Sequence, residues 1–215
     1  MRSNKVNLEK KFMKLAFQKA YNHLGSTKEN PSVGCVVVKN GSVISSGSTS
    51  VNGRPHAEIN ALKAKKNFFG STMYVTLEPC SHYGKTPPCT NSIIKSKIKN
   101  VYYSSDDFDH RTYKKSKKIL KLKNTNVKSG LLIKDTKKLY RSYNYIKKNN
   151  YPYITGKLAC SSNLYILKNN TFITNEHSKK VSHLLRYENH GILTSYKTVN
   201  RDNPKLNCRL YGLEK

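Results

Sequence analysis

Over its first 148 residues, the sequence alternates between helical and strand-like hydrophobic patterns, and this alternation constrains the fold most. Apolar residues at helical spacing predict an amphipathic helix over 8–24. Asn40-Gly41 is a strong hairpin signal, so a partner strand is expected to begin near Val43. In all, we expect strands at 33–38, 73–77, 101–103 and 127–130, and helices at 56–66, 89–97 and 113–122. The pattern predicts a three-layer α/β domain over residues 1–148.

A second, shorter unit is predicted after a polar linker. The linker at 147–152 is rich in Lys and Asn and contains Pro152. After it, we expect a strand at 153–159, a helix at about 178–188 and a strand at 192–194. These elements predict a partial α/β domain over residues 149–215.

The chain of 215 residues carries a formal net charge of +28, with 40 basic and 12 acidic residues. Such a charge would by itself suggest a nucleic acid or an anionic membrane as the partner. However, only seven of the basic residues are Arg, whose guanidinium fork nucleic-acid readers usually use. The Lys excess accompanies many Asn, Ile and Tyr residues, which is typical of a compositional bias. We therefore do not expect nucleic acid as the partner, and the lysine cluster at 114–123 is expected to be a solvated helix face.

Hydrophobicity and cysteine content indicate the cellular environment. No apolar run approaches the roughly 18 residues of a membrane span, and the N-terminus lacks a signal-peptide pattern. The five cysteines are an odd number, which argues against a secreted disulfide framework. We expect a soluble, cytoplasmic protein with no membrane partner, and whether it forms a homo-oligomer is left open.

Four residues form a candidate metal and catalytic centre. His56 and Glu58 open a predicted helix, Cys80 follows a predicted strand, and Cys89 comes nine positions later. One His and two Cys suit Zn²⁺, and three protein ligands leave a fourth tetrahedral position open, as catalytic zinc sites do. Glu58 is close enough to move protons without being a ligand. The alternative is a hydrogen-bonded His and two small buried Cys in a core, but His-x-Glu followed by Pro-Cys and another Cys matches the zinc nucleobase-deaminase signature.

The segment from Thr76 to Cys89 resembles the bacterial riboflavin-biosynthesis deaminase–reductase family, RibD. Eight residues separate its two cysteines, whereas cytidine and tRNA deaminases place about two residues there. The segments Asn30-Pro-Ser-Val-Gly34 and Gly53-Arg-Pro-His-Ala-Glu-Ile-Asn-Ala61 resemble the family as well. The resemblance runs from about residue 8 to 145 and implies a cytidine-deaminase-like fold.

The resemblance also implies a reaction. The family hydrolyses the exocyclic amine of 2,5-diamino-6-ribosylamino-4(3H)-pyrimidinone 5′-phosphate and releases ammonia. A phosphorylated pyrimidine is therefore the expected small-molecule partner. By position in the motifs, zinc is held by His56, Cys80 and Cys89, and Glu58 is the proton donor. Residues at family positions that contact substrate are Asn30, His82, Lys85 and Asp107.

Three positions depart from the family pattern. Thr49 stands where the family usually has a His, and Asp109 stands where it usually has an Asn. The family's Gly-x-Gly is missing around 111–115. These changes are expected to affect substrate affinity more than zinc chemistry.

Residues 151–209 resemble the start of the family's reductase half, which has a dihydrofolate-reductase-like fold and uses NADPH. Thr198 and Asp202 match positions that contact NADP. Positions that contact the reductase substrate are matched by Arg186, Leu206 and Arg209. The family's Ser-x-Asp-Gly is replaced by Ser-Ser-Asn-Leu at 161–164, and later family motifs are not in the sequence. We expect NADPH to be a cofactor only where this half is completed.

Two other functions remain open from the sequence. One is a zinc deaminase that acts on a different nucleobase or nucleotide. The other is a basic RNA-binding protein on an inactive deaminase fold, although the retained Glu58 argues against it.

Overall fold

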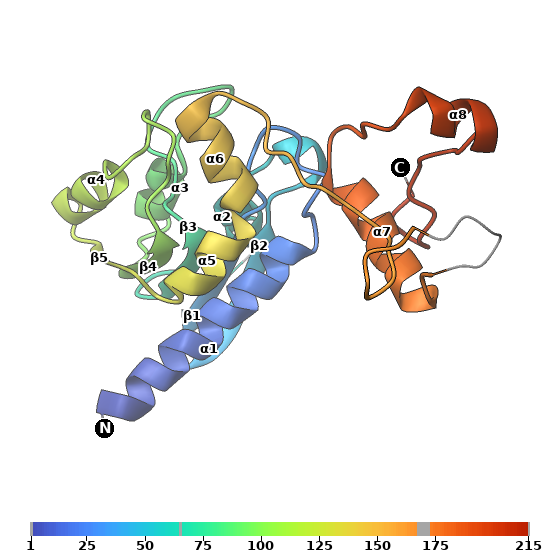
Figure 1. Ribbon diagram of the computed structural model, residues 1–215. Helices are drawn as coiled ribbons and strands as arrows, with labels where there is room; N and C mark the ends of the chain where they lie inside the picture. Colours follow the sequence, from blue (N-terminus) through green and yellow to red (C-terminus); the bar gives the residue numbers. More distant parts are fainter. Residues whose placement is uncertain (1, 65, 167–172, 215) are drawn as a thin grey trace. The chain divides into compact units, whose positions relative to one another are not determined.

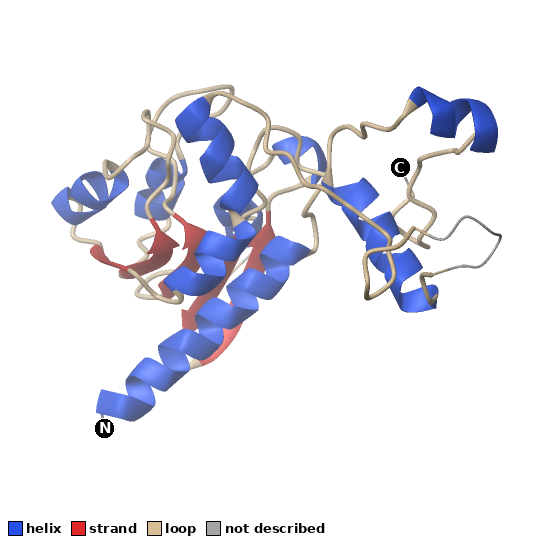
Figure 2. Ribbon diagram, viewed as in Figure 1, coloured by secondary structure: helices blue, strands red, loops and turns tan. Residues whose placement is uncertain are grey.

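The computed structural model describes residues 2–64, 66–166 and 173–214. The chain divides into two compact units, Met1–Tyr153 and Ile154–Lys215 (Figures 1 and 2). In the first unit the strands are β1 (Gly34–Lys39), β2 (Ser42–Ser48), β3 (Thr72–Leu77), β4 (Asn100–Ser105) and β5 (Asn126–Ser129). Its α-helices are α1 (Arg2–Tyr21), α2 (Ala57–Leu62), α3 (Cys89–Lys95), α4 (Ser116–Leu122), α5 (Ile133–Leu139) and α6 (Arg141–Asn149).

The five strands form one mixed sheet in the order β2-β1-β3-β4-β5. β1 pairs antiparallel with β2 and with β3, whereas β3, β4 and β5 run parallel. The β1–β2 hairpin turns at Asn40 and Gly41, whose φ angles of 50° and 76° are those that an Asn-Gly turn favours. β1, β3 and β4 are almost wholly buried, which explains their continuous apolar sequences.

Helices cover both faces of this sheet, which confirms the expected three-layer α/β fold (Figure 1). α1 and α5 pack on one face, and α2 packs on β1 and β2 from the other. Gly47 allows α2 to approach closely, because a Cβ there would lie 2.4 Å from the Ala57 carbonyl oxygen. Since α2 begins directly after His56, this packing fixes the position of the predicted metal ligand relative to the sheet.

The sequence pattern did not predict two helices of the first unit. α5 and α6 occupy 133–149, where the sequence pattern predicts no helix, and α6 extends into the predicted linker at 147–152. Asn150 ends α6 in the left-handed conformation with φ 58°, so the linker is shorter than expected. The buried side chain of Tyr140, between the two helices, joins them to the core by donating a hydrogen bond to the Ser32 carbonyl at 3.1 Å.

The second unit contains α7 (Glu176–Glu188) and α8 (Tyr196–Asp202). α7 confirms the predicted helix near 178–188. Both predicted strands, at 153–159 and 192–194, are wrong, because the described residues there form loops and pair with no other strand. An apolar run becomes a strand only where a partner strand forms hydrogen bonds with its backbone groups. The described part of this unit contains no strand. Within the described residues of the whole chain, no helix has the length and apolar character needed to span a membrane.

Candidate metal centre and active site

Three side chains from separate elements bring their ligand atoms to one point. His56 immediately precedes α2, Cys80 follows β3, and Cys89 is the first residue of α3. His56 Nδ1 lies 3.6 Å from the Cys80 sulfur and 3.4 Å from the Cys89 sulfur. The ligand atoms all lie within 4.8 Å of one another, as one metal ion would require.

The donor set and its dimensions fit zinc. Tetrahedral zinc with Zn–S bonds of about 2.3 Å and Zn–N bonds of about 2.0–2.1 Å requires N···S separations of about 3.6 Å. The two separations at His56 agree with this value within about 0.2 Å. The remaining cysteines, Cys35, Cys160 and Cys208, are free thiols, and Cys35 is fully buried.

The two cysteines are held as a hydrogen-bonded pair. Hydrogen bonds from Cys89, first, and from His56 lower the pKa of Cys80 to about 4, against the opposing effect of burial. The backbone amide of Cys89 also donates to the Cys80 sulfur at 3.2 Å. The same pairing, together with burial, raises the pKa of Cys89. A divalent cation bound here would displace the remaining thiol proton, since metal binding releases ligand protons.

Glu58 lies in the first turn of α2, two residues beyond His56, and its side chain is buried. Burial raises the pKa of Glu58 to about 7, although the neighbouring His56 acts in the opposite direction. A carboxyl group whose pKa lies near neutral can both accept and return a proton, which is what general acid–base catalysis requires.

A cavity of about 80 Å³ opens onto this centre and is lined by His56, Glu58 and Cys80. Of the predicted substrate residues, Asn30, His82 and Asp107 line the cavity as well, whereas Lys85 is exposed on the 81–88 loop and does not line it. Asn30 is positioned by a hydrogen bond from its amide nitrogen to the Gly53 carbonyl at 3.2 Å. A Cβ at Gly53 would lie 2.4 Å from that amide, so this glycine makes room for Asn30.

The loop after β4 closes one side of the cavity. Its anchor is Glu78, a buried carboxylate directly after β3. Glu78 accepts hydrogen bonds from the backbone amides of Asp107 at 3.2 Å, Lys114 at 2.9 Å and Ser116 at 3.1 Å. The Ser116 hydroxyl donates a fourth at 2.7 Å. Four donors on one carboxylate fix the loop and the start of α4 relative to the metal ligands.

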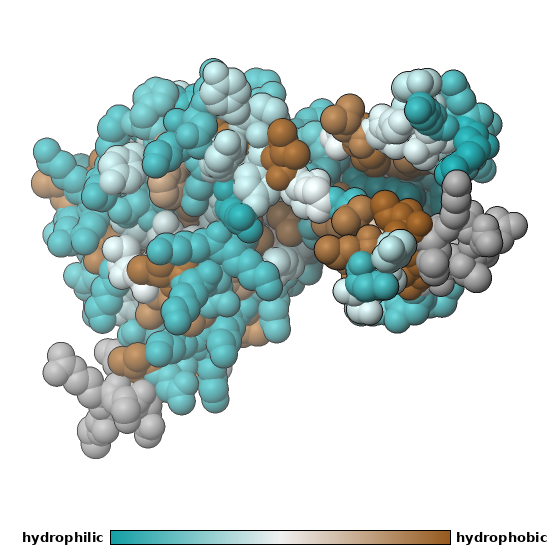
Figure 3. Space-filling view, viewed as in Figure 1, coloured by the Kyte–Doolittle hydropathy of each residue, from teal (hydrophilic) through white to brown (hydrophobic). Residues whose placement is uncertain are grey.

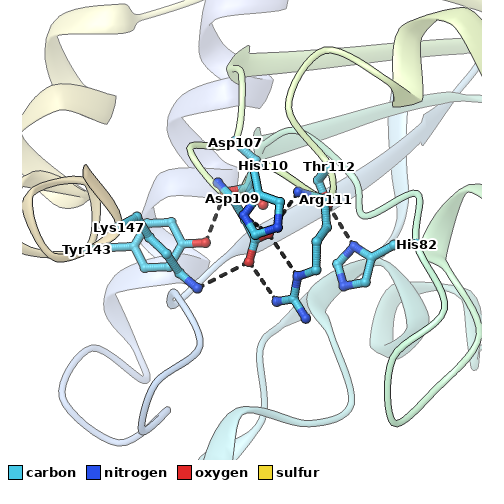
Figure 4. Close-up of polar contacts among 8 residues, drawn as sticks. All are labelled: His82, Asp107, Asp109, His110, Arg111, Thr112, Tyr143 and Lys147. Atoms are coloured by element: carbon cyan, nitrogen blue, oxygen red, sulfur yellow. Dashed lines mark hydrogen bonds and ion pairs between the residues drawn. The ribbon is translucent and has the colours of Figure 1, made fainter. Parts of the chain in front are cut away.

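Two of the departures from the family pattern, Thr49 and Asp109, have defined structural roles. Thr49 is buried, accepts a hydrogen bond from the Val33 amide at 2.9 Å and donates one to the Pro31 carbonyl at 3.2 Å. Asp109 binds two cations: its carboxylate is 2.6 Å from Arg111 Nη2 and 3.1 Å from Lys147 Nζ (Figure 4). Hydrogen bonds from Arg111, first, and then from Lys147 hold the pKa of Asp109 well below its usual range.

The sequence analysis missed four residues that line the cavity: Arg54, Arg111, Tyr143 and Lys147. The last two come from α6, where they lie one turn apart, and the Tyr143 hydroxyl donates to Asp107 Oδ1 at 2.9 Å. The helical spacing of Tyr140, Tyr143 and Lys147 was the available signal.

The first unit is similar to known deaminases. Residues 6–105 match the model of the cytidine and deoxycytidylate deaminase zinc-binding region. The diaminohydroxyphosphoribosylamino-pyrimidine deaminase of Buchnera aphidicola is 45% identical over 119 residues, which cover 55% of this chain and 81% of that protein. The chain belongs to this deaminase family. The fold and the zinc-binding region predicted from the sequence are thereby confirmed.

Longer relatives extend the similarity into the second unit. RibD of Aquifex aeolicus is 38% identical over 97% of this chain, which spans 60% of that protein's length. A crystal structure of the deaminase/5-amino-6-(5-phosphoribosylamino)uracil reductase of Thermotoga maritima superposes with a TM-score of 0.83 at 32% identity. It covers 97% of this chain, and this chain covers 61% of it.

The candidate reductase residues are placed less closely together. Arg186 on α7 donates to the Asn207 carbonyl at 3.2 Å, and the Arg209 guanidinium donates to the Asn207 side chain at 2.9 Å. Thr198 and Asp202 lie one turn apart on α8, and Asp202 is exposed. Leu206 is half-buried in the loop that follows. Neither the cavity described above nor a second cavity, near the ends of β4 and β5, is lined by these residues.

Proposed function

We propose that the chain catalyses the hydrolytic deamination of 2,5-diamino-6-ribosylamino-4(3H)-pyrimidinone 5′-phosphate in riboflavin biosynthesis. One observation carries the proposal: a zinc-compatible His56–Cys80–Cys89 set shares a cavity with the buried carboxyl group of Glu58. Water adds to the ring carbon that bears the amine, the carbon–nitrogen bond breaks, and ammonia leaves as a carbonyl forms.

In this proposal His56, Cys80 and Cys89 hold zinc. When bound, zinc supplies a Lewis acid that lowers the pKa of water in its open position to about 7. Glu58 takes a proton from the attacking water and returns it as the amine leaves. Its burial and its raised pKa suit both steps.

The remaining residues orient the substrate. Asn30 offers an amide that can pair with the polar edge of the pyrimidine ring. His82 and Asp107 line the same cavity, and Lys85 contacts the substrate from the exposed 81–88 loop in this proposal. The chain works in the cytoplasm, and NADPH takes part only where the reductase half is completed.

The metal assignment is tested with two matched cysteine variants. We expect about one zinc per chain in the purified protein and in Cys160→Ser, because Cys160 lies in the second unit. Cys80→Ser removes a ligand, so it loses both zinc and ammonia release. Elemental analysis and an ammonia assay measure the two quantities. Equal zinc content in the two variants would contradict the proposed site.

The substrate assignment is tested on a panel. Ammonia release from the phosphorylated diaminopyrimidine, with none from cytidine, dCMP or tRNA, supports the proposal. The opposite pattern would favour a deaminase for another nucleobase, a candidate that the departures at Thr49 and Asp109 keep open. Salt-dependent RNA binding without ammonia release from any of them would favour the RNA-binding alternative.

A further inference from the structure

We propose that Arg111 and Lys147, held in place by Asp109, form a subsite for the phosphate monoester of the substrate. The inference rests on the proposed function, and it assigns a role to residues that sequence motifs did not indicate. It begins from the cluster in Figure 4, where the 107–112 loop meets α6.

Asp109 fixes both cationic groups at the cavity wall. Its Oδ1 accepts from Arg111 Nε at 2.9 Å, and its Oδ2 accepts from Arg111 Nη2 at 2.6 Å. Lys147 Nζ donates to the same Oδ2 at 3.1 Å. The two cationic groups thus share one carboxylate oxygen, so they lie close enough together to bind one anion.

The arrangement leaves a positive charge and free donors. One carboxylate balances one of the two cations, so the group keeps a net charge of +1. Asp109 uses two of the five guanidinium N–H groups of Arg111 and one of the three on Lys147. No other hydrogen bond within the described ranges engages the rest. The side chains of Arg111 and Lys147 are 52% and 34% exposed, so an incoming anion can reach them.

Among the described residues, Asp109 is the one acidic group that forms an ion pair with Arg111 or Lys147. Glu78 is occupied by its four donors, and Asp107 Oδ1 accepts from the Tyr143 hydroxyl and from the Asp109 amide. Glu58 lies on the metal side of the cavity, and Glu29 is exposed, where water and salt screen its charge.

The position suits a phosphate joined to a ring that is bound at the metal. His82 lies between the two regions: its Nδ1 is 3.0 Å from the Thr112 hydroxyl. Burial lowers its pKa, and the charge of Arg111 adds to this effect, while Cys80 and Asp109 oppose it. The cavity is small, so a ribosyl phosphate attached to a ring at its metal end must extend towards its mouth.

The amide that the family usually has at position 109 could not balance and hold two cations. The carboxylate in this chain holds both Arg111 and Lys147 at the cavity wall. Lys85, in contrast, points from an exposed loop that does not line the cavity. The observations favour Arg111 and Lys147 as the phosphate ligands.

The test uses two adjacent lysines of α6. Lys147→Ala removes a cation from the cavity, whereas Lys148→Ala removes the same charge from a residue that lines the second cavity. Ribose 5-phosphate is titrated into the zinc-loaded full chain by calorimetry, with inorganic phosphate as a second probe. We expect Lys147→Ala and Arg111→Ala to weaken ribose 5-phosphate binding about tenfold or more, and Lys148→Ala to leave it unchanged. Equal weakening in the two lysine variants, or none in Lys147→Ala, would overturn the subsite.

Kinetics separate this inference from the proposed function. With the phosphorylated pyrimidine, Lys147→Ala should raise KM about tenfold and leave kcat unchanged. With the dephosphorylated nucleoside, Lys147→Ala should change KM far less, and Lys148→Ala should change neither constant with either substrate. A parallel loss on both substrates would overturn the phosphate role. If the unaltered chain released no ammonia from either substrate, the proposed function would fail, and the calorimetry would still decide the subsite.

Discussion

The two units of the chain differ in how far they bury their apolar residues. In the Met1–Tyr153 unit, strands and helices enclose a continuous core that includes Met13, Val75 and Leu120, all fully buried. In the described part of the Ile154–Lys215 unit, Cys208 is the one buried hydrophobic residue, while Leu193 is 100% exposed. Figure 3 shows large apolar side chains on the surface of that unit. A site needs a rigid frame, and the contrast explains why the cavity and the metal ligands belong to the first unit.

The largest expected effect concerns Glu58, the carboxyl group that we propose as the proton carrier. Glu58→Gln keeps the size of the side chain but cannot transfer a proton, so the deamination rate should fall about 10²–10⁴-fold. Zinc content should not change, because Glu58 is not a ligand. Glu176→Gln, an exposed carboxyl group of the second unit, is the matched control and should leave the rate unchanged. Near-normal ammonia release by Glu58→Gln, or loss of its zinc, would show that another group moves the proton.

The second prediction compares one substitution in the two units. Leu120→Ala removes a fully buried side chain and should lower the free energy of unfolding of the first unit by about 2–5 kcal/mol. Leu193→Ala removes a fully exposed side chain and should change the free energy of unfolding of the second unit by less than about 0.5 kcal/mol. Urea denaturation followed by tyrosine fluorescence measures both. A similar cost for the two variants would mean that the second unit buries Leu193 in solution.

The sequence predicted the parts of the first unit where local pattern and burial agree. β1, β3 and β4 are buried on both faces, so their apolar runs needed no partner information to be recognised. The proposed ligands His56, Cys80 and Cys89 were predicted because their positions in the motifs are fixed relative to strand and helix ends. The structure places their ligand atoms together.

The rest depends on tertiary contacts that the sequence pattern does not contain. α6 is polar, with Lys147 and Lys148 in its last turn, and its contribution to the cavity follows from how it packs on the loop after β4. The roles of Arg111 and Asp109 likewise depend on that loop being fixed by Glu78. In the second unit, the apolar runs at 153–159 and 192–194 looked like strands, but a strand requires a partner.

The third prediction uses the pH dependence of stability. Burial raises the pKa of Asp107 from its ordinary value of 3.8 to about 6, so the folded chain binds this proton more tightly than the unfolded chain. The stability that the protonated group contributes is full below about pH 4 and is lost as the pH rises through about 6. Relative to Asp107→Asn, the unaltered chain should lose up to about 3 kcal/mol over that range. Urea midpoints from pH 4 to 7 measure the difference.

Asp202, a carboxyl group of the second unit, should show the opposite dependence of stability on pH. The pKa of the exposed Asp202 is lowered by its hydrogen bonds from Arg201, so ionisation favours the folded form there. Stability relative to Asp202→Asn should therefore not fall as the pH rises from 4 to 7. A fall of similar size for both residues would mean that burial of Asp107 is not the cause.

The smallest expected effect is on NADPH. Thr198 and Asp202 lie on a short helix, Asp202 is exposed, and no strand of the described second unit supports them. A dinucleotide site needs donors held by a rigid frame, so we expect this chain to give no NADPH oxidation with the deaminated pyrimidine and no saturable NADPH binding. Absorbance assays measure NADPH oxidation, and fluorescence titration measures NADPH binding.

Because the positive charge of the chain attracts any polyphosphate weakly, the titration is repeated with Asp202→Ala and at raised salt. Binding that salt removes and that the substitution leaves unchanged is non-specific. Turnover, or binding that the substitution abolishes, would show that the second unit forms a working cofactor site despite its exposed apolar residues.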